Sequence, residues 1–143
     1  MKFSEAEGRK VVSTTNAETV GKVDDYIVDP ASRSVVALEL KKTGSGDTVR
    51  WSDIVGFGTD AVTVAGPEKI TDAPADIEAL TGKDHRLRGK RVLSADGDEL
   101  GKVDDVEFDH QSGEITGLVL DDSTVPGVRL IGVGSYAVVV ATT

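Results

Sequence analysis

One pentapeptide occurs twice in this chain of 143 residues, and the repetition constrains the fold more than any other feature. Residues 21–25 read Gly-Lys-Val-Asp-Asp, and the same five residues return at 101–105, 80 positions later. The flanks repeat as well: 8–13 match 89–94, and 56–58 match 132–134. The displacement drifts from 81 to 76 positions, because insertions are tolerated best in turns and loops. A repeat of this kind predicts two copies of one structural unit.

Each copy reads as about six short strands with frequent turns, which is typical of a small β-barrel. Between the copies, residues 72–80 have an early acid, a proline in the first turn and Gly82 as a stop signal, so a short helix is expected there. We therefore predict an all-β fold of two tandem six-stranded barrels joined by a linker with a short helix. The predicted boundaries are 1–66 for the first barrel, 67–86 for the linker and 87–143 for the second barrel.

The strand around the pentapeptide has an irregular period. Val23 and Tyr26 are apolar, and so are Val103 and Val106, but these steps are three residues long where a regular strand steps by two. A β-bulge is therefore predicted at the paired aspartates of each copy.

Composition and charge exclude several functions. The chain has no cysteine, so disulfides and cysteine nucleophiles are absent, and its formal net charge of −9 argues against broad contact with nucleic acid. The paired aspartates lack the spacing of a calcium loop, and His85 and His110 have no matched nucleophile. Trp51 is expected to close the end of a barrel. No leader-like or long apolar segment is evident, so we expect a cytoplasmic protein without membrane insertion, metal or cofactor.

A basic cluster near the linker is the main exception to the acidic character. Arg86, Arg88, Lys90 and Arg91 follow each other closely, with Lys83 just before them. One interpretation is a site for an anionic partner. The interpretation we favour is an electrostatic bridge between two acidic barrels, because no aromatic stacking residues accompany the cluster.

An apolar outer face is predicted on the second copy. In residues 115–120, strand alternation places Thr116, Leu118 and Leu120 on one face and leaves Ile115 and Val119 on the other. The closing strand, 136–140, is apolar on both faces, and Val139 belongs to its outer side. A strand that is apolar on both sides is usually covered on both. Ile115, Val119 and Val139 are therefore candidates for a surface buried against the first barrel or in a homodimer.

Taken together, the repeated motifs resemble the PRC-barrel family. The first copy carries Gly8, Val11-Val12, the pentapeptide, a turn at 29–33 and Trp51-Ser52-Asp53-Ile54; the second carries Gly89, Val92-Leu93, the pentapeptide and a turn at 109–113. The second copy departs from the pattern at 128–131, where the Trp-Ser-Asp turn is missing. The resemblance implies a small six-stranded barrel twice over, as in the cytoplasmic domain of the photosynthetic reaction-centre H subunit and the C-terminal domain of the ribosome-maturation factor RimM. It also implies protein–protein contact in place of catalysis.

We therefore expect a non-enzymatic adaptor that binds another protein, or itself as a homodimer. The alternative is a ribosome-maturation or RNA-associated factor, by analogy with RimM. A steep salt dependence of RNA binding, lost when Arg86, Arg88 and Arg91 are changed to Ala, would favour that alternative.

Overall fold

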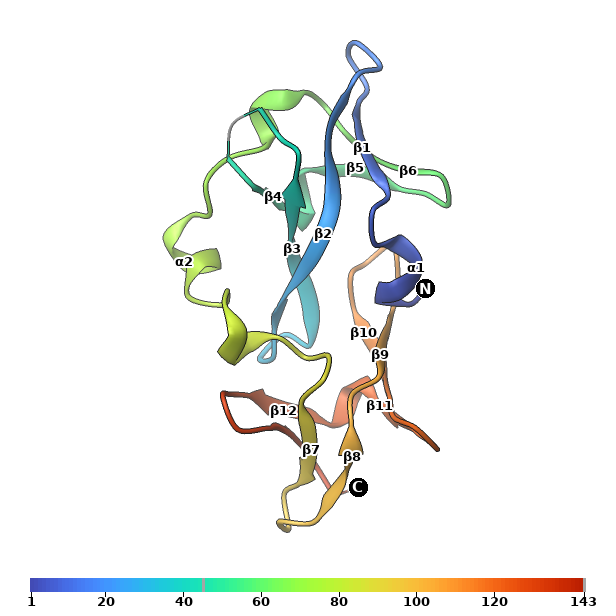
Figure 1. The fold of residues 1–143 in the computed structure, drawn as a ribbon, viewed down its shortest axis with the longest axis vertical. Helices are drawn as coiled ribbons and strands as arrows, with labels where there is room; N and C mark the ends of the chain where they lie inside the picture. Colours follow the sequence, from blue (N-terminus) through green and yellow to red (C-terminus); the bar gives the residue numbers. More distant parts are fainter. Residues whose placement is uncertain (45, 143) are drawn as a thin grey trace.

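The computed structural model describes residues 1–44 and 46–142, and the first copy, residues 1–66, forms one six-stranded sheet (Figure 1). Its elements are α1 (Phe3–Ala6), β1 (Lys10–Ser13), β2 (Thr19–Asp29), β3 (Ser34–Lys41), β4 (Thr48–Arg50), the 3-10 turn η1 (Trp51–Asp53), β5 (Ile54–Phe57) and β6 (Ala61–Val64). The strand order is β4-β3-β2-β1-β6-β5, with β1 and β6 parallel. Val11, Val62 and Val64 are buried while their neighbours along the strand are half-buried or exposed, as alternation requires.

The linker and the second copy, residues 87–142, follow. The linker contains the 3-10 turn η2 (Pro67–Lys69), α2 (Ala75–Glu78) and the 3-10 turn η3 (Lys83–His85). The second copy contains β7 (Arg91–Ser94), β8 (Glu99–Lys102), β9 (Asp105–Phe108), β10 (Ile115–Val119), β11 (Thr124–Pro126), the 3-10 turn η4 (Gly127–Arg129), β12 (Leu130–Val133) and β13 (Val138–Val140). Its sheets have the orders β11-β10-β9 and β12-β13-β7-β8.

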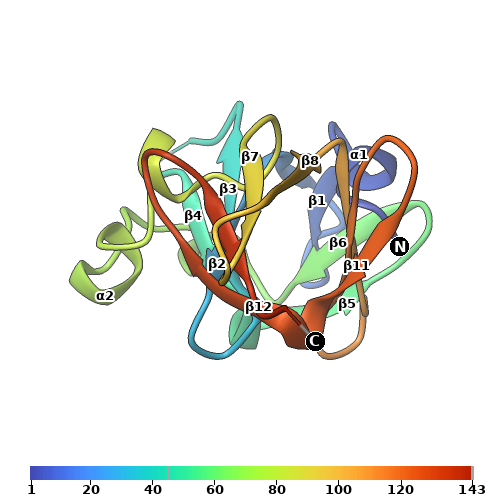
Figure 2. The ribbon, with the colours of Figure 1, turned by 90° about the horizontal axis from the view of Figure 1, so that it is seen from below.

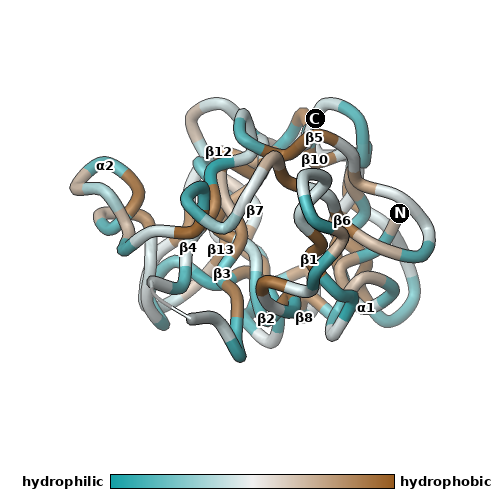
Figure 3. Tube along the Cα trace, turned by 90° about the horizontal axis from the view of Figure 1, so that it is seen from above, coloured by the Kyte–Doolittle hydropathy of each residue, from teal (hydrophilic) through white to brown (hydrophobic). Residues whose placement is uncertain are grey.

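The two copies therefore share one strand order, in which β8 and β9 together take the place of β2. This confirms the predicted all-β fold with two repeated units and a short linker helix. Viewed along the long axis, the strands curve around a common centre (Figure 2), but the sheets are not closed barrels: β4 and β5 end the first sheet without pairing to each other in the described residues. Brown, hydrophobic stretches occur along several strands, and teal, hydrophilic stretches occur in many of the connecting loops (Figure 3).

The predicted irregularity is present in both copies, in two forms. Between β2 and β3 the register shifts from Val23 to Asp25, so the first bulge is confirmed. In the second copy the disturbance is larger, because the strand is interrupted between Lys102 and Asp105 and the sheet divides there.

The copies meet through a short pairing that is symmetric under their exchange. The Val35 amide donates to the Gly113 carbonyl at 2.8 Å, and the Ile115 amide donates to the Arg33 carbonyl at 2.8 Å. These two bonds are equivalent in the repeat, and Ser34 and Glu114 form a bridge between them. The copies are therefore related by a pseudo-twofold rotation at this point.

The leading segment of each copy crosses to the other copy. Met1 and Phe108 exchange two backbone hydrogen bonds, of 3.0 and 2.8 Å, so the segment around α1 pairs with β9. The equivalent segment before β7 reaches back to the first copy, where Arg86 contacts Asp25. Both segments end at an equivalent glycine, since the Gly8 amide donates to the Val23 carbonyl and the Gly89 amide to the Val103 carbonyl.

A single hydrophobic core connects the copies. Phe108 lies among four aromatic rings of the first copy, with centroid separations of 5.5 to 6.1 Å; these belong to Phe3, Tyr26, Trp51 and Phe57. Trp51 is half-buried in this cluster and stacks on Phe57. It therefore packs at the junction of the copies, and the glycine at 113 is needed there because a Cβ would lie 2.9 Å from the indole ring.

The outer faces of the two copies are covered differently. Ile77 of α2 packs with Ile27 and Ala37 on the outer face of β2 and β3. The equivalent positions of the second copy are Glu107 and Gly117, which need no apolar cover. Among the described residues, no helix combines the length and apolarity needed to cross a membrane.

Candidate interaction surface

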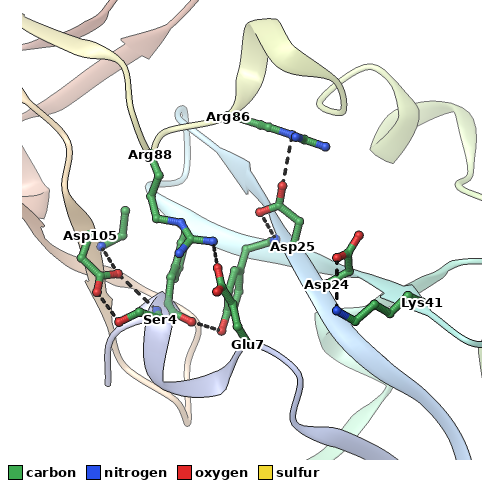
Figure 4. Close-up of polar contacts among 11 residues, drawn as sticks. Ser4, Glu7, Asp24, Asp25, Lys41, Arg86, Arg88 and Asp105 are labelled. Carbon is green, nitrogen blue, oxygen red and sulfur yellow. Dashed lines mark hydrogen bonds and ion pairs between the residues drawn. The ribbon is translucent and has the colours of Figure 1, made fainter.

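Part of the predicted basic cluster lies at the junction of the copies, where Arg86 and Arg88 contact carboxylates (Figure 4). Arg86 Nε is 3.1 Å from Asp25 Oδ2, and Arg88 forms an ion pair with Glu7 while lying over the Phe3 ring. Arg91 is 3.4 Å from Glu99. The linker is thus fastened to α1 and β2 by opposite charges, as the bridging interpretation requires; binding of an anionic partner stays a prediction.

Lys90 differs from these arginines. Its Nζ is buried and is the one buried side-chain nitrogen or oxygen without a hydrogen-bond partner in the described part of the chain. Burial lowers the pKa of Lys90, and the Asp84 carboxylate opposes this only in part. Its counterpart in the repeat, Arg9, donates to the Gly58 carbonyl at 2.7 Å and the Glu5 carbonyl at 3.1 Å. The lysine side chain is shorter, and its amine makes no hydrogen bond that corresponds to those of Arg9.

The junction also contains a pocket of about 450 Å³, and several of its lining side chains, among them Asp25, Tyr26 and Arg88, take part in hydrogen bonds or ion pairs. The Tyr26 hydroxyl donates to the Phe3 carbonyl at 2.9 Å, and burial raises the pKa of Tyr26. Asp105 accepts hydrogen bonds from the amide and hydroxyl of Ser4 (Figure 4). These contacts hold α1 against β2 and β9.

Candidate catalytic and metal-binding residues do not converge within the described chain. His85 Nδ1 is 2.9 Å from the Thr81 carbonyl, and His110 Nδ1 is 3.2 Å from the Phe57 carbonyl, so each ring holds a loop in place. No cluster of three or more potential ligand side chains is found in residues 1–44 and 46–142. An acidic hollow on the surface includes Glu39, whose pKa is raised by burial and then by the Asp25 carboxylate.

The predicted outer face of β10 is only partly apolar. A register shift between Ile115 and Gly117 turns Ile115 inward, where it is 1% exposed, and leaves Thr116 exposed. The predicted assignment of Ile115 and Thr116 to faces was therefore wrong, because strand alternation does not hold across a bulge. Val119 and Val139 are half-buried. The use of these residues in binding stays a prediction.

An uncovered apolar face lies on the outer side of the sheet β12-β13-β7-β8. Gly132, Val139, Leu93 and Glu99 are neighbours in one row across these strands, and Arg91 and Lys102 are neighbours in the next. We call these residues, together with Gly134, Tyr136 and Ala137, the β7–β13 face. Ile131, on the edge strand beside it, is 51% exposed.

The β7–β13 face has a hollow and a projecting ring. The hollow has a volume of about 410 Å³, and nothing lies within 4 Å of the space that a side chain at Gly132 or Gly134 would take. Tyr136 is 67% exposed at its margin, and Arg91 lies 4.6 Å from the ring centroid and donates to its hydroxyl. It is the one aromatic residue of the chain outside the central cluster.

The equivalent face of the first copy is more polar. Thr63 replaces Val139, Val12 replaces Leu93, Asp60 replaces Tyr136 and Thr19 replaces Glu99, while Lys22 matches Lys102. Sequence reasoning identified Val139 but missed Leu93 and Tyr136. The replacement of Asp60 by an aromatic residue in the repeat was the signal that would have identified Tyr136.

The comparisons with known proteins agree with the repeat. The model of the PRC-barrel domain matches the chain twice, over residues 1–70 and 82–141. A search of curated proteins found no match. Because the two matches cover nearly the whole chain, with strands in the same order in both copies, this protein belongs to the PRC-barrel family.

Proposed function

We propose that this chain is a non-enzymatic protein-interaction module whose binding surface is the β7–β13 face. The observation that carries the proposal is the uncovered apolar surface there, formed by Leu93, Val139 and Tyr136. Tyrosine and arginine are enriched among the residues that contribute most to binding at protein interfaces. The partner is another protein or a second copy of the chain, as the sequence predicted.

The histidine contacts support a role without catalysis. Each imidazole has Nδ1 within hydrogen-bond distance of a backbone carbonyl, that of Thr81 for His85 and that of Phe57 of β5 for His110, which is a structural task. The RNA-associated alternative has less support, because Arg86, Arg88 and Arg91 each lie against a carboxylate that reduces their attraction for phosphate.

The test replaces the β7–β13 face by its first-copy counterpart. A variant with Leu93→Val, Tyr136→Asp and Val139→Thr carries residues that the same strand order already accepts in the first copy. Wild type and variant are used as baits in extract from the native cell, and the bound proteins, including the chain itself, are compared by mass spectrometry.

We expect proteins bound by the wild type to be lost from the variant, while both baits retain the same melting temperature. Val55→Asp, at a position 64% exposed on the first copy, is the matched control and should leave binding unchanged. Identical sets of bound proteins for wild type and the triple variant would contradict the proposal.

A further inference from the structure

We infer that the occupant of the β7–β13 face is a second copy of this chain, packed across a twofold axis that runs perpendicular to the strands. The inference rests on the proposed function and specifies its partner. It commits to an isologous dimer, in which the same surface of each chain meets itself.

The charged residues in the two neighbouring rows of the face are arranged so that the face is complementary in charge to a second copy of itself. Glu99 stands at the end of the row through Leu93 and Val139, and Lys102 stands at the same end of the neighbouring row. A twofold axis between the rows exchanges them. It therefore places Glu99 of each chain opposite Lys102 of the other, and keeps the charged ends of the two faces together.

The same rotation brings the apolar ends together. Tyr136 lies beside the Gly134 end of the face, and exchange of the rows carries it to the Gly132 and Ile131 end of the other chain. The open space above the two glycines can receive the projecting ring. An aromatic side chain buried in this way contributes a large apolar area and orients the contact through its polar tip.

The net charge of the chain limits the expected affinity of the dimer. The chain carries a formal charge of −9, so two copies repel each other over distance. Near the face, Arg91 and Lys102 offset Glu99, which removes that repulsion at short range. We therefore expect a dimer of about micromolar to millimolar affinity that becomes tighter as salt screens the net charge.

The first copy shows why its own face does not serve this purpose. Thr19 stands where the second copy has Glu99, and Lys22 matches Lys102. A second chain would therefore find no carboxylate opposite Lys22 there, and Asp60 would stand where the second copy has the tyrosine ring.

Sedimentation velocity of the full chain, from low micromolar to about 1 mM, tests the inference. We expect the mass to rise from monomer to dimer in the wild type. Tyr136→Asp should weaken the association about tenfold or more. Glu99→Lys and Lys102→Glu should each weaken it by placing like charges opposite each other.

Charge exchange separates a direct contact from a folding defect. The double variant Glu99→Lys with Lys102→Glu should dimerise again, and so should a mixture of the two single variants, since each restores opposite charges across the axis. Melting temperatures check that all variants fold. Tyr136→Asp loses association with its melting temperature unchanged if the ring acts at the interface.

Two results would overturn the inference. One is a wild type that stays monomeric at every concentration, and the other is a dimer that the single charge reversals leave unchanged. If the wild type is monomeric but the triple variant of the proposed function still loses bound proteins, the second copy is the wrong occupant and the proposed function stands. If neither association nor capture depends on the face, both are wrong.

Discussion

The two copies share a strand order but differ in what covers them. On the first copy, α2 packs on β2 and β3, and the face around β1 and β6 is polar; on the second, the β9–β10 face is polar and the β7–β13 face is apolar. Inward positions are kept alike because they must fill one shared core at close packing. Outward positions are free to diverge, so the differences between equivalent surface residues indicate function better than the repeat itself does.

The two copies also differ in the core residues at equivalent positions. The aromatic cluster takes Phe3, Tyr26, Trp51 and Phe57 from the first copy and only Phe108 from the second. The counterpart of Phe108 is Val28, and the counterpart of Trp51 is Gly127, whose Cβ would lie 1.9 Å from the Ile115 carbonyl. In each of these two pairs of equivalent positions, one copy has a large aromatic ring and the other has a small residue. This difference in size lets the two pseudo-symmetric halves pack together.

The largest loss of stability is expected when the central ring of Phe108 is removed. Phe108→Ala removes the side chain that all four aromatic residues contact and should cost about 3–5 kcal/mol of unfolding free energy. The counterpart change Val28→Ala deletes fewer buried groups and should cost about 2 kcal/mol. Chemical denaturation of both variants measures the difference, and equal costs would show that the core is not centred on Phe108.

The next largest loss of stability is expected at Asp105, and it should exceed the loss at the equivalent Asp25. Both carboxylates accept a hydrogen bond from the amide of the following residue. Asp105 is 8% exposed and also accepts hydrogen bonds from Ser4, whereas Asp25 forms a more open ion pair with Arg86. Asp105→Ala should cost about 2–3 kcal/mol and release α1, because it leaves the buried Val106 amide without this partner and removes both bonds from Ser4. Asp25→Ala should cost less than about 1 kcal/mol. Faster amide exchange in residues 1–6 only for Asp105→Ala is the diagnostic sign.

A smaller change, a gain in stability, is expected when Lys90 is replaced. Lys90→Met removes a buried amine without a partner and should stabilise the fold, by less than about 1 kcal/mol because water partly screens the charge. Lys90→Arg tests whether the longer side chain can make the contacts of Arg9. A loss of stability in both variants would show that the amine has a favourable role.

The Lys90 effect should depend on pH. Its pKa in the folded chain lies below the ordinary value of 10.5, so the unfolded chain binds the proton more tightly. The lysine therefore contributes stability that increases with pH between the lowered pKa and 10.5. The advantage of Lys90→Met should be full at pH 7 and shrink towards pH 10 in thermal melts.

The smallest effect concerns Glu39, which corresponds to Val119. Its pKa is raised by burial and by Asp25, so the folded chain disfavours its charged form at neutral pH. Glu39→Gln should stabilise by about 0.3 kcal/mol at pH 7, after allowance for solvent screening. The gain should disappear below pH 4.5, where the glutamate is protonated in both states. A gain that persists at low pH would have another cause.

Much of the fold could be predicted from the repeat, because two copies with matching motifs, such as 21–25 and 101–105, adopt the same strand order. The bulge at Asp24 and Asp25 followed from the apolar period alone. The turning of Ile115 into the core did not, since a second register shift occurs where no change in hydrophobic pattern marks it.

The candidate surface was less accessible to sequence reasoning. Val139 was recognised because its strand is apolar on both faces, but Leu93 and Tyr136 join it only through the parallel pairing of β7 with β13 and the turn before β13. The exchange of leading segments, which brings Arg86 to Asp25 and Ser4 to Asp105, also depends on contacts between distant parts of the chain. Local patterns carry no information on such contacts.

The central claim, that a few outward residues make one copy an interface and leave the other inert, is tested most directly by transferring them. A variant with Val12→Leu, Thr19→Glu, Asp60→Tyr and Thr63→Val gives the first copy the residues of the β7–β13 face. Sedimentation velocity should then show masses above the dimer that increase with concentration, since each chain would carry two self-complementary faces. A mass indistinguishable from wild type, with an unchanged melting temperature, would contradict the claim.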